Sequence, residues 1–256
     1  MNLIVILIFL KLLPMMAMDN QFNSNPGKQI EIEDCPAEGE KLKVVAFGNS
    51  ITATRNTIKQ VYAQRLPSLL LKKGIRAEVI NAGAPGSHTG SVKDHDLFKI
   101  RHGMDRFETD VLAHNPDLVI IGFGTNDAYI DGSDPEGPSR IPLANYEKNL
   151  SSWIESLQEK SVQLILIAPN CLGKKFPRHQ NERLYVYVQT VRKLSEKYST
   201  GLVDNYQMFL DFEKENNHSM EELMLDGIHP NDLGHERIAH QLVREITRLV
   251  ENPQNK

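Results

Sequence analysis

Residues 44–52 read VVAFGNSIT, and this stretch decides how the rest of the chain is interpreted. A short apolar run ends in a glycine, and polar side chains follow at once. Such a run, bounded by glycine, is typical of a strand buried on both faces of a sheet. Two interpretations of Ser50 are open at this point. Ser50, Thr52 or Thr54 caps a following helix, or Ser50 is a nucleophile held at the carboxyl end of the strand.

The same pattern recurs along the chain and predicts an α/β protein. Short apolar runs lie at 43–47, 77–81, 117–123, 162–168 and 201–204. Longer segments with helical spacing lie between and after them, at 57–73, about 92–114, 143–160, 182–198 and 233–251. Alternating strands and helices predict right-handed crossovers and a parallel five-stranded sheet with helices on both faces. We find no internal repeat, and we expect residues 41–252 to form a single domain.

The N-terminus differs from this pattern. Residues 3–10 read LIVILIFL, which is too short to span a bilayer and resembles the apolar region of a secretory signal peptide. We therefore interpret residues 1–18 as a signal peptide or N-terminal anchor and residues 19–40 as a linker. Lys11 interrupts the apolar stretch, so a mis-assigned start codon and an uncleaved anchor stay open. A signal peptide implies a periplasmic or extracellular protein; otherwise the protein is membrane-anchored or cytoplasmic.

Composition excludes several classes of protein. A chain of 256 residues has a net charge of only −4, which argues against a nucleic-acid-binding surface. Two cysteines, Cys35 and Cys171, form neither a disulfide framework nor a zinc pattern. We interpret them as free thiols, although the sequence does not settle whether they pair.

Ligand sites of open parallel sheets lie beyond the carboxyl ends of the strands. Polar or glycine-rich stretches occur after every predicted strand. Besides Ser50, they are NAGAPGSHT at 81–89, GTNDAY at 124–129, APNC at 168–171 and DGIHPNDLGH at 226–235. The candidate functional residues should therefore gather at one edge of the sheet.

A serine hydroxyl is a weak nucleophile and needs a base, usually a histidine oriented by a carboxylate. Among nine histidines, only His229 lies in a turn-rich exit with an acid close by, Asp226. The spacing of three residues lets the carboxylate reach one imidazole nitrogen while the other faces outward. His229 could instead be a surface histidine, or bind metal with Asp226 and His235. Ligands without further spacing evidence do not define a metal site, so we expect no metal.

Acyl transfer also requires donors aimed at a developing oxyanion. The backbone N–H of Ser50 can supply one. Gly86 can bring a second backbone N–H close because it has no side chain, and the side-chain amide of Asn126 can supply a third. The alternatives are a turn glycine and an Asx-turn asparagine. The other histidines have plainer interpretations: a solvated helix face for His95 and His102, and the surface or the edge of the core for His235.

Four blocks of this sequence resemble the SGNH hydrolases, also called GDSL-type esterases and lipases. They are Gly48-Asn49-Ser50-Ile51-Thr52, Gly86 within residues 81–86, Gly124-Thr125-Asn126-Asp127, and Asp226-Gly227-Ile228-His229-Pro230. The resemblance implies a three-layer α/β/α sandwich of flavodoxin-like fold, without metal or organic cofactor. It implies hydrolysis of carboxylic esters through an acyl-serine intermediate, with Ser50, Asp226 and His229 as catalytic residues and Ser50, Gly86 and Asn126 forming the oxyanion hole.

The first block departs from the family pattern, since Asn49 stands where aspartate is usual. An amide is nearly isosteric with a carboxylate and still makes turn hydrogen bonds, but it removes a negative charge. We expect activity to survive, because the proposed base and its acid are His229 and Asp226. The Gly-x-Ser-x-Gly elbow of α/β-hydrolases is absent, because position 52 is threonine.

Two long exits should shape the substrate pocket, because specificity tends to reside in such loops. Residues 129–142 are polar, and residues 171–184 are rich in basic side chains. Neither resembles an apolar lid, so we expect a small acyl group such as acetyl on a polar or carbohydrate alcohol. We expect no nucleic-acid partner and no stable protein partner. An acyltransferase, a thioesterase or lysophospholipase, and a non-catalytic binding module are the alternatives. A nucleotide-binding domain would need a glycine-rich phosphate loop, which GNSITAT is not.

Overall fold

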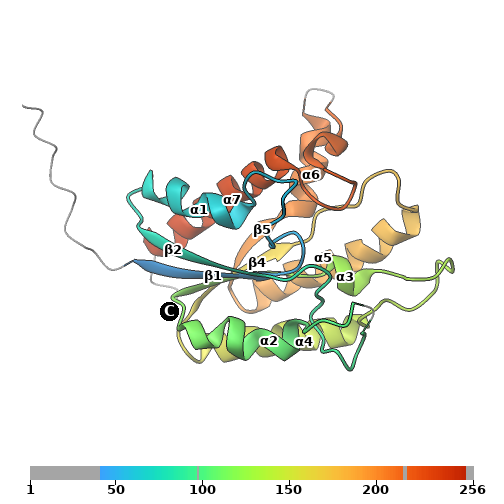
Figure 1. Ribbon diagram of the computed structural model, residues 1–256, viewed down its shortest axis with the longest axis horizontal. Helices are drawn as coiled ribbons and strands as arrows, with labels where there is room; N and C mark the ends of the chain where they lie inside the picture. Colours follow the sequence, from blue (N-terminus) through green and yellow to red (C-terminus); the bar gives the residue numbers. More distant parts are fainter. Residues whose placement is uncertain (1–40, 97, 216–217, 252–256) are drawn as a thin grey trace, which may run out of the picture. The chain divides into compact units, whose positions relative to one another are not determined.

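The computed structural model describes residues 41–96, 98–215 and 218–251, and these residues form a five-stranded parallel sheet (Figure 1). The strand order is β2-β1-β3-β4-β5, with every neighbouring pair parallel. The strands are β1 (Leu42–Gly48), β2 (Ala77–Gly83), β3 (Leu118–Gly122), β4 (Gln163–Ala168) and β5 (Gly201–Asp204). The predicted α/β/α fold is confirmed. The predicted leader (1–18), the linker (19–40) and Cys35 lie outside the described residues.

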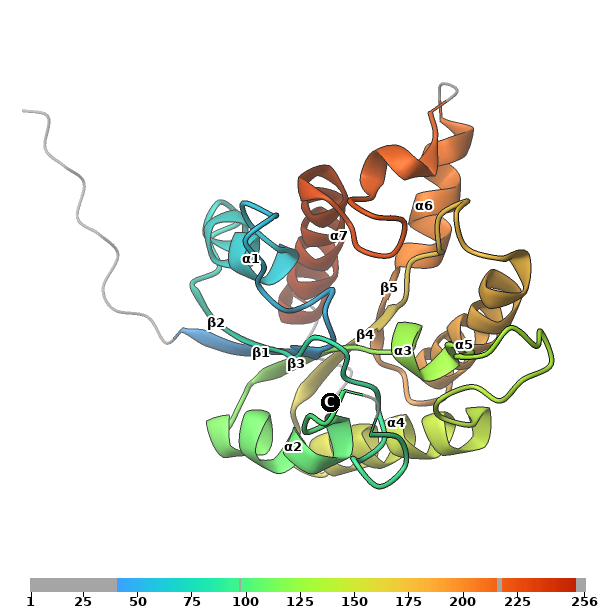
Figure 2. The ribbon, with the colours of Figure 1, turned by 45° about the vertical axis from the view of Figure 1, so that its right-hand side comes forward.

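Helices cover both faces of this sheet (Figures 1 and 2). One layer contains α1 (Tyr62–Leu71), α6 (Asn205–Lys214) and α7 (Asp232–Glu251). The other contains α2 (Gly103–Asp110), α4 (Leu143–Gln158) and α5 (Arg178–Lys197), and the short α3 (Thr125–Ala128) begins just after β3. None of the helices that the structure describes combines the length and the hydropathy needed to cross a bilayer.

The central strands have two buried faces because each layer of helices contributes its own apolar cluster. In β1, Val44 and Ala46 pack with α1 and α7, whereas Val45 and Phe47 pack with the α2, α4 and α5 layer. The expectation of burial on both faces is wrong for the second run, because β2 is an edge strand whose residues are mostly only half-buried.

The predicted helices 143–160, 182–198 and 233–251 correspond closely to α4, α5 and α7. The other two were too long. Helix α1 begins only at Tyr62. Among the described residues of the segment 92–114, the helical ones belong to α2 and to a short 3-10 helix, Leu112–His114. At the start of that segment the Asp94 carboxylate accepts hydrogen bonds from the amide and hydroxyl of Ser91, a local turn that competes with a helix.

Helix α6 was not predicted, although it carries a recognisable start signal. The Asp204 carboxylate accepts a hydrogen bond from the Gln207 amide, which is the usual cap of a first turn. The sequence runs directly from strand β5 into this helix without a glycine or proline. The strand and the helix are therefore hard to separate by pattern alone.

Candidate active site

The nucleophile turn follows β1 without a gap. The carbonyl of Asn49 accepts hydrogen bonds from the amides of Thr52 and Ala53. Its side-chain Oδ1 accepts a third, from the Ile51 amide at 2.9 Å. Asn49 is buried, and Ser50, which it flanks, is half-buried. The side-chain amide therefore makes the one turn hydrogen bond that an aspartate could make, without adding a charge beside Ser50.

The structure brings Ser50 together with Asp226 and His229. The Nε2 atom of His229 lies 2.9 Å from Ser50 Oγ. On the other side of the ring, Nδ1 lies 2.8 Å from Asp226 Oδ2. The same carboxylate accepts hydrogen bonds from the backbone amides of Ile228 and His229, at 3.1 and 2.9 Å. A hydroxyl, an imidazole and a carboxylate thus form one continuous chain, the arrangement that activates a serine.

We call residues 224–230 the acid–base loop, and its geometry is fixed by contacts from the exit of β4. The buried Asn170 donates a hydrogen bond to the Ile228 carbonyl at 2.9 Å. The Gly173 amide donates to the Gly227 carbonyl at 2.7 Å. Gly227 has a φ of +77°, a conformation that side chains rarely adopt. The sequence predicted no role for the exit APNC at 168–171, but its contacts position His229.

Burial and charge set the protonation of the two ionisable side chains. Burial lowers the pKa of His229, the Asp226 hydrogen bond raises it, and the positive charges of Arg55 and Lys175 lower it again, so the net direction is downward. Partial burial tends to raise the pKa of Asp226, but hydrogen bonds from Ile228 and His229 outweigh it and hold the pKa at about 2. At neutral pH the imidazole is therefore neutral and able to accept a proton.

The loops that follow β2 and β3 contact each other. The Asn126 side-chain amide donates to the Ser87 carbonyl at 2.8 Å, which joins the loop after β2 to helix α3. Gly86 precedes Ser87 and has a φ of +78°. An added Cβ at Gly86 would lie 2.8 Å from the Phe98 ring, so only glycine fits. The oxyanion roles of Ser50, Gly86 and Asn126 remain predictions.

Asp127 was not singled out from the sequence, yet it holds these two exits together. Its carboxylate accepts hydrogen bonds from the Thr89 amide and hydroxyl at 2.7 and 2.6 Å, and from the Gly124 amide at 3.0 Å. The side chain is fully buried, and burial raises its pKa to about 6 despite those hydrogen bonds. The signal in the sequence was its place in the GTND block, but its partner Thr89 is 38 residues away.

A second residue that sequence reasoning missed is Arg106 of α2. Its buried guanidinium donates to the carbonyls of Gly48 and Ala82, both at 2.6 Å. It lies over the Phe47 ring, 4.4 Å from the centroid. Arg106 thereby fixes the ends of β1 and β2 where the nucleophile turn and the Gly86 loop begin.

The expectation for His102 was wrong. His102 does not lie on a solvated helix face: it is fully buried and stacked on His88 with ring centroids 3.6 Å apart. Of the two places expected for His235, the surface is excluded: the residue is 1% exposed, and its Nδ1 accepts a hydrogen bond from the Tyr62 amide at the start of α1. Within the described ranges, no three histidine, cysteine or acidic side chains are placed to bind a metal ion. Cys171 is buried, which raises the pKa of its thiol to about 12.

Comparison with known proteins identifies the family. A model of the GDSL-like Lipase/Acylhydrolase family matches residues 46–237. The chain belongs to this family. It is 30% identical to the uncharacterized lipoprotein YqeF of Bacillus subtilis (strain 168) over 192 residues, 66% of this chain and 72% of that protein.

Two further relatives carry esterase names. An acetylxylan esterase of Geobacillus stearothermophilus is 26% identical over 174 residues, 68% of this chain and 73% of that protein. The crystal structure of the acetyl xylan esterase AlAXEase superposes with a TM-score of 0.61 at 28% identity, and the match covers 78% of this chain and 97% of that one. The chain is accordingly a carboxylic ester hydrolase of the GDSL-like family.

Proposed function

We propose that this protein is a serine esterase that removes small acyl groups, acetyl above all, from a polar or carbohydrate alcohol. The observation that carries the proposal is the continuous contact from Ser50 Oγ through the His229 ring to the Asp226 carboxylate, at 2.9 and 2.8 Å. The half-buried nucleophile leaves room for an ester to approach from solvent.

In this mechanism His229 Nε2 takes the proton of Ser50 as Oγ attacks the ester carbonyl carbon. The backbone N–H groups of Ser50 and Gly86 and the side-chain amide of Asn126 stabilise the tetrahedral oxyanion. The C–O bond to the alcohol then breaks, and His229 returns the proton to the leaving oxygen. Water, activated by the same imidazole, hydrolyses the acyl-serine and regenerates the free hydroxyl.

A small acyl group is supported by the two long exits that border the site. Residues 129–142 are polar and residues 171–184 are rich in basic side chains, so neither exit offers the apolar lid that a long acyl chain would need. The acetylxylan esterase names of two relatives point in the same direction.

The experiment is a chain-length series of p-nitrophenyl esters, assayed with the wild type and with Ser50→Ala. We expect the highest kcat/KM on the acetyl ester, and a loss of about three or more orders of magnitude in the variant. High activity on long-chain esters with none on acetate would overturn the small acyl group. Equal activity in both proteins would overturn Ser50 as nucleophile, and transfer to an added sugar in place of hydrolysis would reassign the reaction as acyl transfer.

We also propose that residues 1–18 direct export and that residues 41–252 act as one catalytic domain. The apolar run at 3–10 and the lipoprotein name of the Bacillus relative support export. Fractionation of cells that produce the full chain tests it: recovery outside the cytoplasm is expected, and a wholly cytoplasmic protein would contradict it.

A further inference from the structure

The alcohol half of the ester has a defined place if Ser50 and His229 act as proposed. His229 Nε2, 2.9 Å from Ser50 Oγ, must return its proton to the leaving oxygen. Asn126, on the other exit, is the proposed donor to the carbonyl oxygen instead. The leaving alcohol therefore lies over the acid–base loop, and the side chains that border this loop are the ones that contact it.

Lys175 borders the loop directly. A Cβ added to Gly227 would lie 3.0 Å from Lys175 Cε, so the lysine side chain packs against the residue between the acid and the base. The backbone hydrogen bond from Gly173 to Gly227 holds the start of the 171–184 exit in this place. The ammonium lies 5.3 Å from the Phe176 ring centroid, and Lys175 is exposed. Its charge is therefore available to a ligand.

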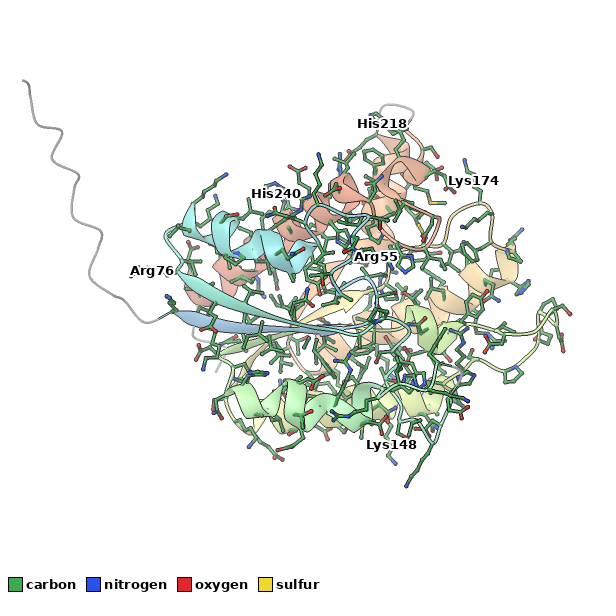
Figure 3. The ribbon with its side chains drawn as sticks, in the orientation of Figure 1. Arg55, Arg76, Lys148, Lys174, His218 and His240 are labelled. Atoms are coloured by element: carbon green, nitrogen blue, oxygen red, sulfur yellow. The ribbon has the colours of Figure 1, made fainter. Side chains whose placement is uncertain are left out.

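Arg55 reaches the same region from the loop that follows the nucleophile turn. Its carbonyl accepts a hydrogen bond from the Ile58 amide. The Asp232 carboxylate accepts from the next two amides, Lys59 and Gln60, which ties this loop to the start of α7 just beyond His229. The Arg55 side chain is half-buried, and Figure 3 shows it beside the sheet on the same side as α6 and α7.

The two cations of this region, Arg55 and Lys175, are not neutralised by ion pairs with other described residues. The nearby carboxylates are already engaged: Asp226 with His229, Asp232 with Arg65, and Glu221 with the Lys174 amide. Among the residues that the structure describes, neither Arg55 nor Lys175 forms an ion pair. Both charges nevertheless act on the His229 ring, where they lower its pKa in addition to the larger effect of burial. Two cations outside ion pairs thus act on the imidazole that protonates the leaving alcohol in the proposed mechanism.

We propose that Arg55 and Lys175 form a subsite for a carboxylate on the alcohol half of the ester, so that the preferred substrate is the acyl ester of a hydroxy acid such as an acidic sugar. This inference rests on the proposed esterase function. A carboxylate would accept hydrogen bonds from the Arg55 guanidinium and the Lys175 ammonium, which are stronger than those between neutral groups. It would be held while its hydroxyl oxygen leaves toward His229.

The test compares two acetyl esters of the same shape, 4-acetoxybenzoate and its neutral amide, 4-acetoxybenzamide. We expect the wild type to prefer the anion in kcat/KM by about three- to tenfold, the range of one or two partly exposed ion pairs. The variant Arg55→Gln/Lys175→Gln should lose the preference. Added salt should weaken it in the wild type, because exposed charges are screened.

The matched control is Arg178→Gln, a cation of the same exit that is already paired with Glu182 at 2.7 Å. The control should leave the preference unchanged. A wild type that hydrolyses both esters through Ser50 without preferring the anion would overturn the subsite and leave the esterase function standing. A preference that the double variant retains would also overturn it. If the double variant instead loses only activity on phenyl hydrogen succinate, the charge belongs to the acyl half, and the assignment to the alcohol is wrong.

A second readout tests the position of the two cations without any charged substrate. Removing a positive charge near His229 must raise the pKa of its imidazole. The acid limb of kcat/KM on the neutral amide should therefore move to higher pH in Arg55→Gln and in Lys175→Gln. An acid limb that stays in place in both variants would mean that neither side chain borders the acid–base loop in solution, and would contradict the proposal.

Discussion

The two halves of the site are built in different ways. On the oxyanion side, Asn126 and the Gly86 loop are joined through Asp127, a fully buried carboxylate that accepts three hydrogen bonds. On the acid–base side, the Asp226 side chain is 42% exposed, and the positive charges of the half-buried Arg55 and the exposed Lys175 act on His229. Buried hydrogen bonds fix geometry and respond little to solvent, whereas exposed charges are screened by salt. The first half should therefore be rigid, and the second should tune protonation and substrate choice.

The largest effect should come from removing the base. We expect His229→Ala to lower kcat/KM on p-nitrophenyl acetate by about 10⁴-fold, because Ser50 loses its proton acceptor. His240→Ala, on the exposed side of α7, is the matched control and should keep full activity. Steady-state kinetics with both variants checks this. A loss below tenfold in His229→Ala would show that another group takes the proton.

Removing one donor of the oxyanion half should lower activity less than removing the base. Asn126→Ala removes one of three proposed donors, and we expect kcat to fall by about 10²- to 10³-fold with KM little changed. Asn145→Ala, an exposed asparagine on α4, serves as the control. If Asn126→Ala raised KM and left kcat intact, the side chain would bind the ground state and the oxyanion role would be wrong.

Asp127→Asn weakens the hydrogen bonds that hold the two exits around that donor together. The amide keeps the shape but replaces one acceptor oxygen with a donor. Either the hydrogen bonds from Thr89 to Oδ1 or the one from Gly124 to Oδ2 is therefore lost. We expect a loss of about 1–3 kcal/mol in the free energy of unfolding and a fall in kcat of roughly tenfold. Asp117→Asn is the control: this exposed carboxylate accepts from the Lys43 amide at the far end of β1. Equal free energies of unfolding in urea for the two variants would contradict the stabilising role of Asp127.

The smallest expected effect is a loss of stability at acidic pH. Burial lowers the pKa of His88, behind the oxyanion loop, to about 4, and that of His235 to about 3. In the unfolded chain both protonate near the ordinary value of 6.5. Their contribution to stability is therefore fully present above pH ~6.5 and is lost progressively as the pH falls toward 4. The raised pKa of Asp127 opposes this trend between its ordinary value of 3.8 and about 6.

Urea unfolding between pH 8 and pH 4.5, roughly the range in which the two histidines titrate in the unfolded chain, measures this dependence. The free energy of unfolding should fall steadily through the range, and His88→Gln should flatten the curve. A stability that rose on acidification would show that Asp127 outweighs both histidines.

Much of the architecture was predictable, because strand and helix periodicity is a local signal. The runs at 43–47 and 201–204 lie within or coincide with strands, and the α/β/α layers follow from their alternation. The rule that sites lie beyond the carboxyl ends of parallel strands placed Ser50, Asp226 and His229 at one edge. The structure puts them in contact.

What the sequence could not supply depends on distant contacts. Asp127 and Arg106 each have a hydrogen-bond partner far away in the sequence, Thr89 and Gly48, so their burial has no local pattern. The segment 92–102 has helical spacing, but local hydrogen bonds and the stacking of His102 on His88 hold it in another conformation. The tie between Asn170 and the acid–base loop spans 58 residues and could be seen only after folding.

The most direct test of the account is to find which residue becomes covalently modified. A fluorophosphonate reagent, which reacts with activated serines, should attach to the wild type once per chain, and mass spectrometry should place it on the peptide that contains Ser50. His229→Ala should label far more slowly, because its Ser50 lacks a base. Modification at Ser87 or another hydroxyl, or full esterase activity in the labelled protein, would contradict Ser50 as the nucleophile.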